Sequence, residues 1–266
     1  MIKVREHISE WLSPIDAFWS IQLIRDLNLS KGLEIGVYKG AWSGLILDNI
    51  LNSKVIGVDP YPGLKHIEVI MHKELIDFES ENRFQCFTSI EMLDPGLIFD
   101  FVHIDGEHSE DAIKHDLTES LIRLANGGFI AIDDFMNRSF PGVTSATIIT
   151  AAKLDLKPIL ITESKIYVVR SRDHLASMIA VGKINDDFNL GGSSQYKNGS
   201  YGESYSQDGK ILGVNPFIQS RLSNLKIDQL LSRKLSAKRI VRSTMYSITP
   251  PLFRIFARYV ISILRK

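Results

Sequence analysis

Cysteine is almost absent from this sequence, because Cys86 is the single one among 266 residues. One thiol cannot form a disulfide within the chain, and it provides no partner for thiol-pair redox chemistry. Structural disulfides are typical of oxidising compartments, so the composition favours a protein of the reducing cytoplasm.

Long hydrophobic runs are also missing, although hydrophobic residues make up 44% of the chain. No uninterrupted apolar run reaches the ~18–20 residues that spanning a bilayer requires. Residues 1–11 carry several charges and lack the apolar core of a secretory signal. We therefore expect a cytoplasmic protein with one substantial α/β domain and smaller appendages.

The chain also lacks a net charge, because 31 basic residues balance 31 acidic ones. Residues 233–266 hold nine Lys or Arg and no Asp or Glu, which leaves 22 basic and 31 acidic groups in residues 1–232, or about −9. In residues 252–265 arginines are interleaved with a broad aliphatic surface, as in a helix on an anionic membrane surface. The alternative is a helix packed on its own domain or on a second copy of the chain. Nucleic acid is not expected as a partner of such a mixed surface.

Four apolar segments recur between residues 33 and 135, each followed by glycine or polar residues. They are residues 33–36, 55–58, 101–104 and 129–132, with helix-like stretches between them. This alternation predicts a doubly wound α/β fold, in which ligands bind beyond the carboxyl ends of the strands.

The first turn carries a pattern typical of a cofactor site. Gly36 and Gly40 lie where the strand turns into a helix, and glycine lets a ligand approach the backbone closely. The helix start offers free N–H groups, and Asp59 at the end of the next strand is placed to accept hydrogen bonds from ribose hydroxyls. A nucleoside-containing cofactor is therefore predicted. The spacing from Glu34, Glu-x-Gly-x-x-x-Gly, argues against the dinucleotide pattern and so against NAD. A turn without a ligand is the alternative, with Asp59 as a plain turn carboxylate.

On these segments the chain resembles the class I S-adenosylmethionine-dependent methyltransferases, in the branch of small-molecule O-methyltransferases that act on sugars or catechols. Residues 34–40 match the first motif of that family, residues 55–59 its ribose-binding strand, and residues 99–108 and 124–134 its fourth and fifth strands. The resemblance covers about residues 30–172. It implies a seven-stranded, mostly parallel Rossmann-like sheet of order 3-2-1-4-5-7-6, with the last strand antiparallel. It also implies S-adenosylmethionine as cofactor, held by Glu34, Gly36, Gly40, Asp59, Thr88, Ser89 and Asp105.

Three carboxylates, those of Asp105, Asp133 and Asp134, follow neighbouring strands and should project into one crevice. Without a cation they would raise one another's pKa, and a hard divalent ion such as Mg²⁺, or Mn²⁺, removes the repulsion through oxygen ligands. Metal-dependent members of the resembled family place an acidic residue after strand four and an acidic pair after strand five. We therefore expect these three residues to be metal ligands. Alternatively, Asp134 starts a turn and Asp133 caps a helix.

His108 lies three residues beyond Asp105. A neutral imidazole can accept the proton of a hydroxyl that attacks a sulfonium methyl group near pH 7. In the resembled sugar O-methyltransferases an Asp-x-x-His segment provides a metal ligand and the base, so His108 is the expected catalytic residue. Relatives often carry an aromatic residue next, whereas this chain has Ser109. The alternative for His108 is a surface histidine bonded to Asp111 or Asp116, and His103, within a strand, is expected to be a core residue.

Outside the four segments, spacing predicts the remaining organisation. Residues 1–29 are expected to form one or two covering helices, with Pro14 in an early turn and apolar residues, Trp19 among them, at helical spacing. The methyltransferase domain is expected to span residues 30–182 and to end in a hairpin of residues 158–162 and 166–170. Residues 183–213, rich in Gly, Ser and Tyr, are predicted to be a flexible linker or lid, and residues 214–266 a basic amphipathic helical tail.

The resemblance, together with these candidate residues, implies an enzyme that transfers a methyl group from S-adenosylmethionine to a hydroxyl of a small molecule, a sugar or glycoconjugate, with the help of a divalent metal. The alternatives are a metal-free methyltransferase of the same fold and a methyltransferase-like binding module brought to membranes by its basic tail. Peripheral membrane contact through residues 233–266 and a homo-oligomer are the further partners considered.

Overall fold

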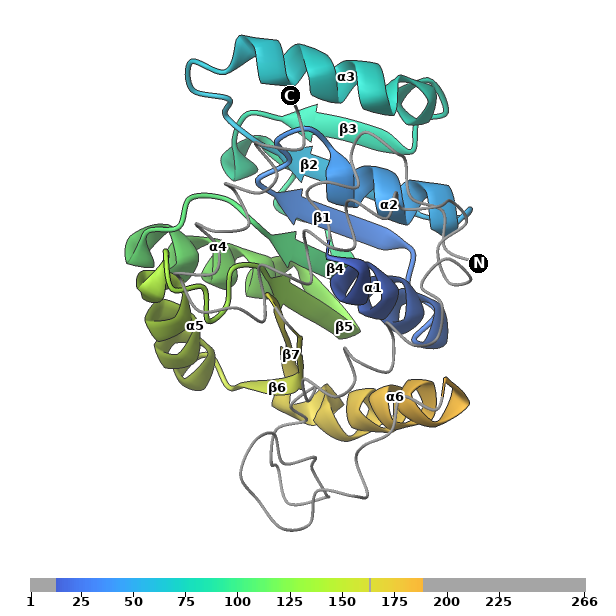
Figure 1. Ribbon diagram of the computed structural model, residues 1–266, viewed down its shortest axis with the longest axis vertical. Coiled ribbons are helices and arrows are strands. Elements are labelled where there is room, and N and C mark those ends of the chain that lie inside the picture. Colours follow the sequence, from blue (N-terminus) through green and yellow to red (C-terminus); the bar gives the residue numbers. More distant parts are fainter. Residues whose placement is uncertain (1–12, 163, 189–266) are drawn as a thin grey trace, which may run out of the picture.

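The computed structural model describes residues 13–162 and 164–188. Its centre is a seven-stranded sheet of order β3-β2-β1-β4-β5-β7-β6 (Figure 1). The strands are β1 (Lys31–Ile35), β2 (Lys54–Val58), β3 (Phe84–Phe87), β4 (Phe99–Ile104), β5 (Leu124–Ile132), β6 (Leu156–Ile161) and β7 (Ile166–Arg170). The helices are α1 (Pro14–Asp26), α2 (Ala41–Asn49), α3 (Lys65–Ser80), α4 (Glu110–Arg123), α5 (Pro141–Lys153) and α6 (His174–Asp187), with short 3₁₀ turns η2 (Ile90–Met92) and η3 (Ser171–Asp173).

The strand pairing confirms the predicted topology. The first five strands pair in parallel, whereas β7 runs antiparallel to both β5 and β6. The central strands are buried on both faces, as expected for apolar runs that lack polar alternation. The carboxyl ends of β1 to β5 consequently meet at one edge of the sheet, where the chain turns into loops and helices.

Two hydrophobic cores lie on opposite faces of the sheet. Alternate residues of each strand point to opposite faces, so that Phe101 contributes to one core and Val102 to the other. Helices α1, α2, α3 and α6 complete the first core, and α4 and α5 complete the second (Figure 1). The domain is therefore a three-layer sandwich with its sheet in the middle.

The N-terminal helix α1 is buried along almost its whole length. Pro14 occupies its first turn, where a missing N–H costs nothing, and residues 15–24 are all buried. Trp19 is 1% exposed and packs edge-on against Phe18, so it lies in the first core. Helix α1 contacts α2 and α6, so it is an integral part of the first core.

Helix α6 continues to Asp187, five residues beyond the expected domain boundary at residue 182. The apolar side of its last turns includes Val181 and Ile184. It packs into the first core, which stabilises the helix beyond residue 182. The linker from residue 191 onward, the basic tail and any helix within residues 1–12 lie outside the described residues. Among the helices that the structure does describe, none has the length and apolar character to span a membrane.

Candidate active site

Except for Glu34, which lies within β1, the site residues predicted from the sequence lie just beyond the carboxyl ends of the strands. The strand order reverses between β1 and β4, so the crevice at this edge is the topological switch point where open α/β sheets bind ligands. Gly36 and Gly40 follow β1, and Asp59 follows β2. Thr88 and Ser89 follow β3, Asp105 and His108 follow β4, and Asp133 and Asp134 follow β5.

The turn after β1 depends on glycine at two positions. Gly36 has φ +85°, and a Cβ there would lie 2.0 Å from the carbonyl oxygen of Asp105. Gly40, with φ +77°, precedes the first residue of α2, and a Cβ there would meet the Leu75 side chain at 2.7 Å. The absence of a side chain at Gly36 therefore allows the turn to approach the end of β4, which brings the two halves of the site together.

Asp59 organises the same turn. Its Oδ2 accepts hydrogen bonds from the backbone N–H groups of Val37 (3.0 Å) and Tyr38 (2.9 Å), and its Oδ1 accepts one from Tyr61 (2.9 Å). Tyr38 has a positive φ of 49°, so these bonds hold an unfavourable backbone conformation. The half-buried carboxylate keeps further lone pairs on Oδ1, and its predicted contact with a ribose stays a prediction.

Glu34 lies inside the protein rather than in the crevice. It is 2% exposed, one carboxyl oxygen accepts from the Ser43 hydroxyl, and the other lies 3.2 Å from His103 Nδ1. Burial raises the pKa of Glu34 well above its ordinary value, which favours a protonated carboxyl. Both carboxyl oxygens thus contact groups inside the protein, Ser43 on α2 and His103 on β4, and direct donor binding by Glu34, expected from the resemblance, stays a prediction.

Thr88 and Ser89 lie at the end of β3, where the family resemblance places the adenine. Thr88 is exposed, and its hydroxyl contacts Met92 Sδ at 3.2 Å. The Ser89 hydroxyl accepts a hydrogen bond from the N–H of Glu91 and caps η2. Both side chains thus border the edge, and their contact with adenine stays a prediction.

Asp133 is neutralised by a lysine from the same domain. Its Oδ2 forms an ion pair with the Lys165 ammonium, and its Oδ1 accepts from Ser164 Oγ at 2.8 Å. Burial alone would raise the pKa of Asp133, but the charge of Lys165 and the hydrogen bonds from Lys165 and Ser164 outweigh burial and lower it to about 2. Burial likewise opposes the charge of Lys165, yet Asp133, Asp16 and Asp105 together raise its pKa, so the ammonium is retained.

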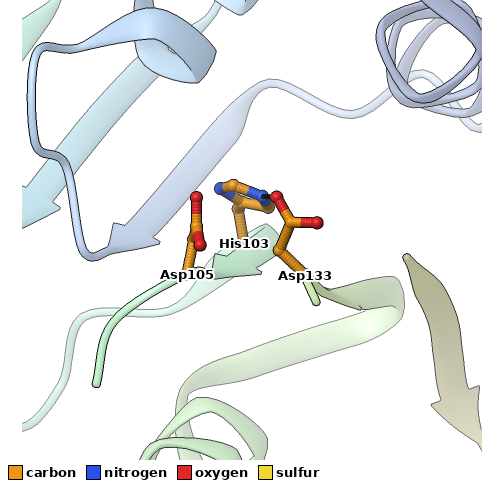
Figure 2. Close-up of side chains that lie close together, drawn as sticks. All are labelled: His103, Asp105 and Asp133. Atoms are coloured by element: carbon orange, nitrogen blue, oxygen red, sulfur yellow. Dashed lines mark ion pairs between the residues drawn. The ribbon is translucent and has the colours of Figure 1, made fainter. Parts of the chain in front are cut away.

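His103 connects this pair to Glu34. The imidazole is 1% exposed, stacks on Trp42 with ring centroids 4.5 Å apart, and places Nε2 2.9 Å from Lys165 Nζ. Burial, reinforced by Lys165, lowers the pKa of His103 well below its ordinary value, so the ring is neutral. Figure 2 shows His103 on β4 and Asp105 just beyond the end of this strand, with Asp133 beside them just beyond the end of β5. The predicted role of His103 as a core residue is confirmed, although the residue belongs to a polar core network.

The second cluster faces the crevice and contains His108. Its Nε2 lies 2.9 Å from Asp134 Oδ2 and 3.8 Å from Asp105 Oδ1, and the Phe140 ring stacks on the imidazole with centroids 4.0 Å apart. The Asp105 carboxylate, with further help from Asp134, raises the pKa of His108 against the effect of burial. The alternative partners Asp111 and Asp116 are therefore wrong for His108 among the described contacts. Phe140 supplies the aromatic neighbour that the sequence lacks after His108.

The donors predicted to form one metal site are divided between two groups. Within the described residues, the compact groups are His103 with Asp105 and Asp133, and Asp105 with His108 and Asp134. Asp133 and Asp134 do not share a group, because Asp133 turns toward Lys165 while Asp134, with φ +54°, turns toward His108. Asp133 therefore does not cap a helix, and the expected trio of carboxylates is not assembled.

Several residues of the site were missed by the sequence reasoning, namely Asp16, Phe140, Ser164 and Lys165. Asp16 lies on α1, fully buried, and accepts hydrogen bonds from Thr162 and from Ser164 at 2.9 Å. Nothing in the local sequence marks these residues, since a lysine in a predicted hairpin turn is usually solvated.

Comparison with known proteins gives a family match over the central part of the chain. Residues 33–135 match the family model described as a methyltransferase domain. These residues, less than half of the chain, are thus similar to a methyltransferase domain. No curated protein matches the sequence.

Two solved methyltransferase structures have a similar fold. A Staphylococcus aureus protein assigned as a caffeoyl-CoA O-methyltransferase is 14% identical with a TM-score of 0.51, over 60% of this chain and 85% of the other. An SAH-bound methyltransferase from Podospora anserina is 15% identical with a TM-score of 0.50, over 61% and 81% of the two chains. At such identities the likeness shows the fold and leaves the acceptor open.

Proposed function

We propose that this protein transfers the methyl group of S-adenosylmethionine to a hydroxyl oxygen of a small molecule, a sugar or glycoconjugate. The observation that carries the proposal is the His108 imidazole, which faces Asp105 and Asp134 at the edge of the sheet. The turn after Gly36 reaches the same edge, so a donor bound there would lie beside the histidine. The sugar class rests on the resemblance of the Asp105-x-x-His108 segment to sugar O-methyltransferases.

His108 is the proposed acceptor of the hydroxyl proton. As the hydroxyl oxygen bonds to the methyl carbon, the carbon–sulfur bond of the sulfonium breaks and its electron pair stays on sulfur. The proton passes to His108, and the resulting imidazolium is stabilised by the carboxylates of Asp105 and Asp134. Because these carboxylates raise the pKa of His108, the fraction of neutral base increases as the pH rises through that pKa.

Asp105, His108 and Asp134 are also the residues that would hold a divalent metal. Their donor atoms converge within 4.8 Å, and the buried His108 Nε2 already lies 2.9 Å from Asp134 Oδ2. Two carboxylates and an imidazole suit Mn²⁺ better than Mg²⁺, which prefers oxygen ligands alone. A metal bound there would lower the pKa of the acceptor hydroxyl, and His108 would then serve as ligand rather than base.

A methyl-transfer screen tests this proposal. Protein freed of metal with a chelator is assayed with labelled S-adenosylmethionine and sets of sugars, nucleotide sugars and catechols, with and without added Mn²⁺ or Mg²⁺. His108→Gln should lower the transfer rate about 10²–10⁴-fold, whereas His66→Gln, an exposed residue on α3, should not. Activity that survives chelation identifies His108 as the base, and activity that needs added metal identifies it as a ligand. Transfer by His108→Gln at the wild-type rate would contradict both roles.

The remaining predicted partners stay predictions of the sequence. Contact of residues 233–266 with an anionic membrane is tested by co-sedimentation with vesicles at low and high salt, since screening weakens surface attraction. A homo-oligomer is tested by sedimentation of the full-length chain.

A further inference from the structure

A chain of polar contacts connects the N-terminal helix to the crevice. Asp16 on α1 accepts hydrogen bonds from Thr162 and Ser164, on either side of the β6–β7 turn. The Ser164 hydroxyl also lies 2.8 Å from Asp133 Oδ1. The backbone carbonyl of Ser164 accepts a hydrogen bond from the N–H of Phe135 at 2.8 Å. The turn between β6 and β7 is thus fixed against the segment that follows β5.

Lys165 is the only ammonium group among the described residues that contacts Asp133, and it is 3% exposed. Its ammonium binds Asp133 Oδ2 and lies 2.9 Å from His103 Nε2, so two neighbours from two strands fix its position. Lysine is rarely buried without a partner, because desolvation of an unpaired ammonium is costly. The lysine therefore has a defined position and fixes in turn the carboxylate that it neutralises.

Asp133 passes this constraint to its neighbour in sequence. Its Oδ1 accepts a hydrogen bond from the backbone N–H of Asp134 at 2.8 Å. Asp134 has φ +54°, a conformation that a residue other than glycine adopts at a cost. In this conformation its Oδ2 lies 2.9 Å from His108 Nε2, while Asn137 Nδ2 donates to its Oδ1 at 2.6 Å.

We propose that Lys165 is a positioning residue: it holds Asp133, and Asp133 holds the backbone of Asp134 so that the Asp134 carboxylate faces His108. The inference rests on the proposed role of His108. It gives the hairpin beyond β5 a part in methyl transfer, although no hairpin side chain contacts His108 in the described residues. It also explains why the acidic pair after β5 has two separate tasks, since one carboxylate is bound by an internal cation and the other faces the crevice.

Two double variants separate positioning from charge balance. Lys165→Met/Asp133→Asn removes both charges but retains Oδ1 as an acceptor for the Asp134 N–H. Lys165→Met/Asp133→Ala removes both charges and the acceptor. Neither leaves an unpaired charge at position 133, which would destabilise the single variant Lys165→Met. Lys183→Met serves as control, because Lys183 is 61% exposed and pairs with Asp26 on the surface.

The first readout is the His108 ring signal in nuclear magnetic resonance spectra of metal-free protein labelled at histidine, identified by its loss in His108→Asn. We expect the signal of the Asn double variant to resemble wild type and that of the Ala double variant to be displaced, at equal far-ultraviolet circular dichroism. S-adenosylmethionine affinity should change less than about threefold in both, because the turn after Gly36 is untouched. This readout needs no acceptor, so it stands even where the screen finds no methyl transfer.

The second readout is methyl transfer to an acceptor from the screen. The Ala double variant should lose about 10–100-fold in kcat, the cost of a misplaced catalytic group, and the Asn double variant should recover most of it. Wild-type His108 signals in both double variants would overturn the proposal and leave Lys165 a purely structural residue. Displaced signals in both, at unchanged fold, would also overturn it, because the acceptor at position 133 would then not be the link.

Discussion

Asp16 offers a test of the buried network that needs no ligand. The residue is fully buried on α1, and burial raises its pKa from 3.8 to about 6, against the opposing charge of Lys165. Because the pKa of Asp16 is higher in the folded protein than in the unfolded chain, the folded protein binds the carboxyl proton more tightly. The resulting stabilisation is fully present below pH 3.8 and is lost as the pH rises through about 6.

The expected magnitude follows from these two values. A pKa raised from 3.8 to about 6 corresponds to a maximum of about 3 kcal/mol. At pH 5 most of Asp16 is protonated in the folded protein and little of it in the unfolded chain. The free energy of unfolding should therefore gain about 1.3 kcal/mol from this group between pH 7 and pH 5. Asp16→Asn cannot titrate and should lack this gain.

Urea unfolding followed by tryptophan fluorescence measures the effect. The quantity of interest is the difference in unfolding free energy between wild type and Asp16→Asn, at pH 7 and at pH 5. Ser20→Ala is the control, because it removes a hydrogen bond to Tyr167 from the same helix without changing a titratable group. The reasoning would be refuted if this difference in unfolding free energy were the same at both pH values, or if it favoured wild type at pH 7. Either result would show that Asp16 is held as a carboxylate.

Three further variants test the crevice itself. Gly36→Ala should lower the free energy of unfolding by more than ~1 kcal/mol and abolish S-adenosylmethionine binding, because its Cβ would meet the Asp105 carbonyl at 2.0 Å. Gly63→Ala is the control in thermal unfolding, because Gly63 also has a positive φ but no atom lies within 4 Å of the added Cβ. Asp59→Ala should weaken donor binding by ~1.5–3 kcal/mol in calorimetric titration, because a charged acceptor is lost and the turn loses three hydrogen bonds; unchanged affinity would remove Asp59 from the donor site. Phe140→Ala should slow methyl transfer about tenfold or more, because His108 loses its stacked ring. Donor affinity should stay within about threefold of wild type, and an unchanged rate would show that the ring is dispensable.

Much of the fold could be predicted because its signals are local or depend on order along the chain. The apolar segments that end at Gly36, Asp59, Asp105 and Asp133 correspond to β1, β2, β4 and β5, and the last hairpin pairs as expected. Parallel strands place their carboxyl ends at one edge, so candidates spread over a hundred residues could be assigned to one crevice.

The polar core could not be predicted, because its partners are distant in sequence. Asp16 and Ser164 are 148 positions apart, and Lys165 and His103 are 62 apart. Seen alone, the acidic pair Asp133-Asp134 resembles two equivalent metal ligands. Their different tasks depend on Lys165, whose burial is decided by α1 and by the sheet packing, and on the positive φ of Asp134.

The burial of α1 also has a practical consequence for dividing the protein. The segment that matches the methyltransferase family, residues 33–135, ends before β6, β7 and Lys165 and begins after Asp16. A fragment cut to that match would expose the face of the sheet that α1 and α6 cover, and would leave Asp133 without its cation. The smallest unit that keeps the site intact is therefore longer than its recognisable motif and extends at both ends, from α1 through α6.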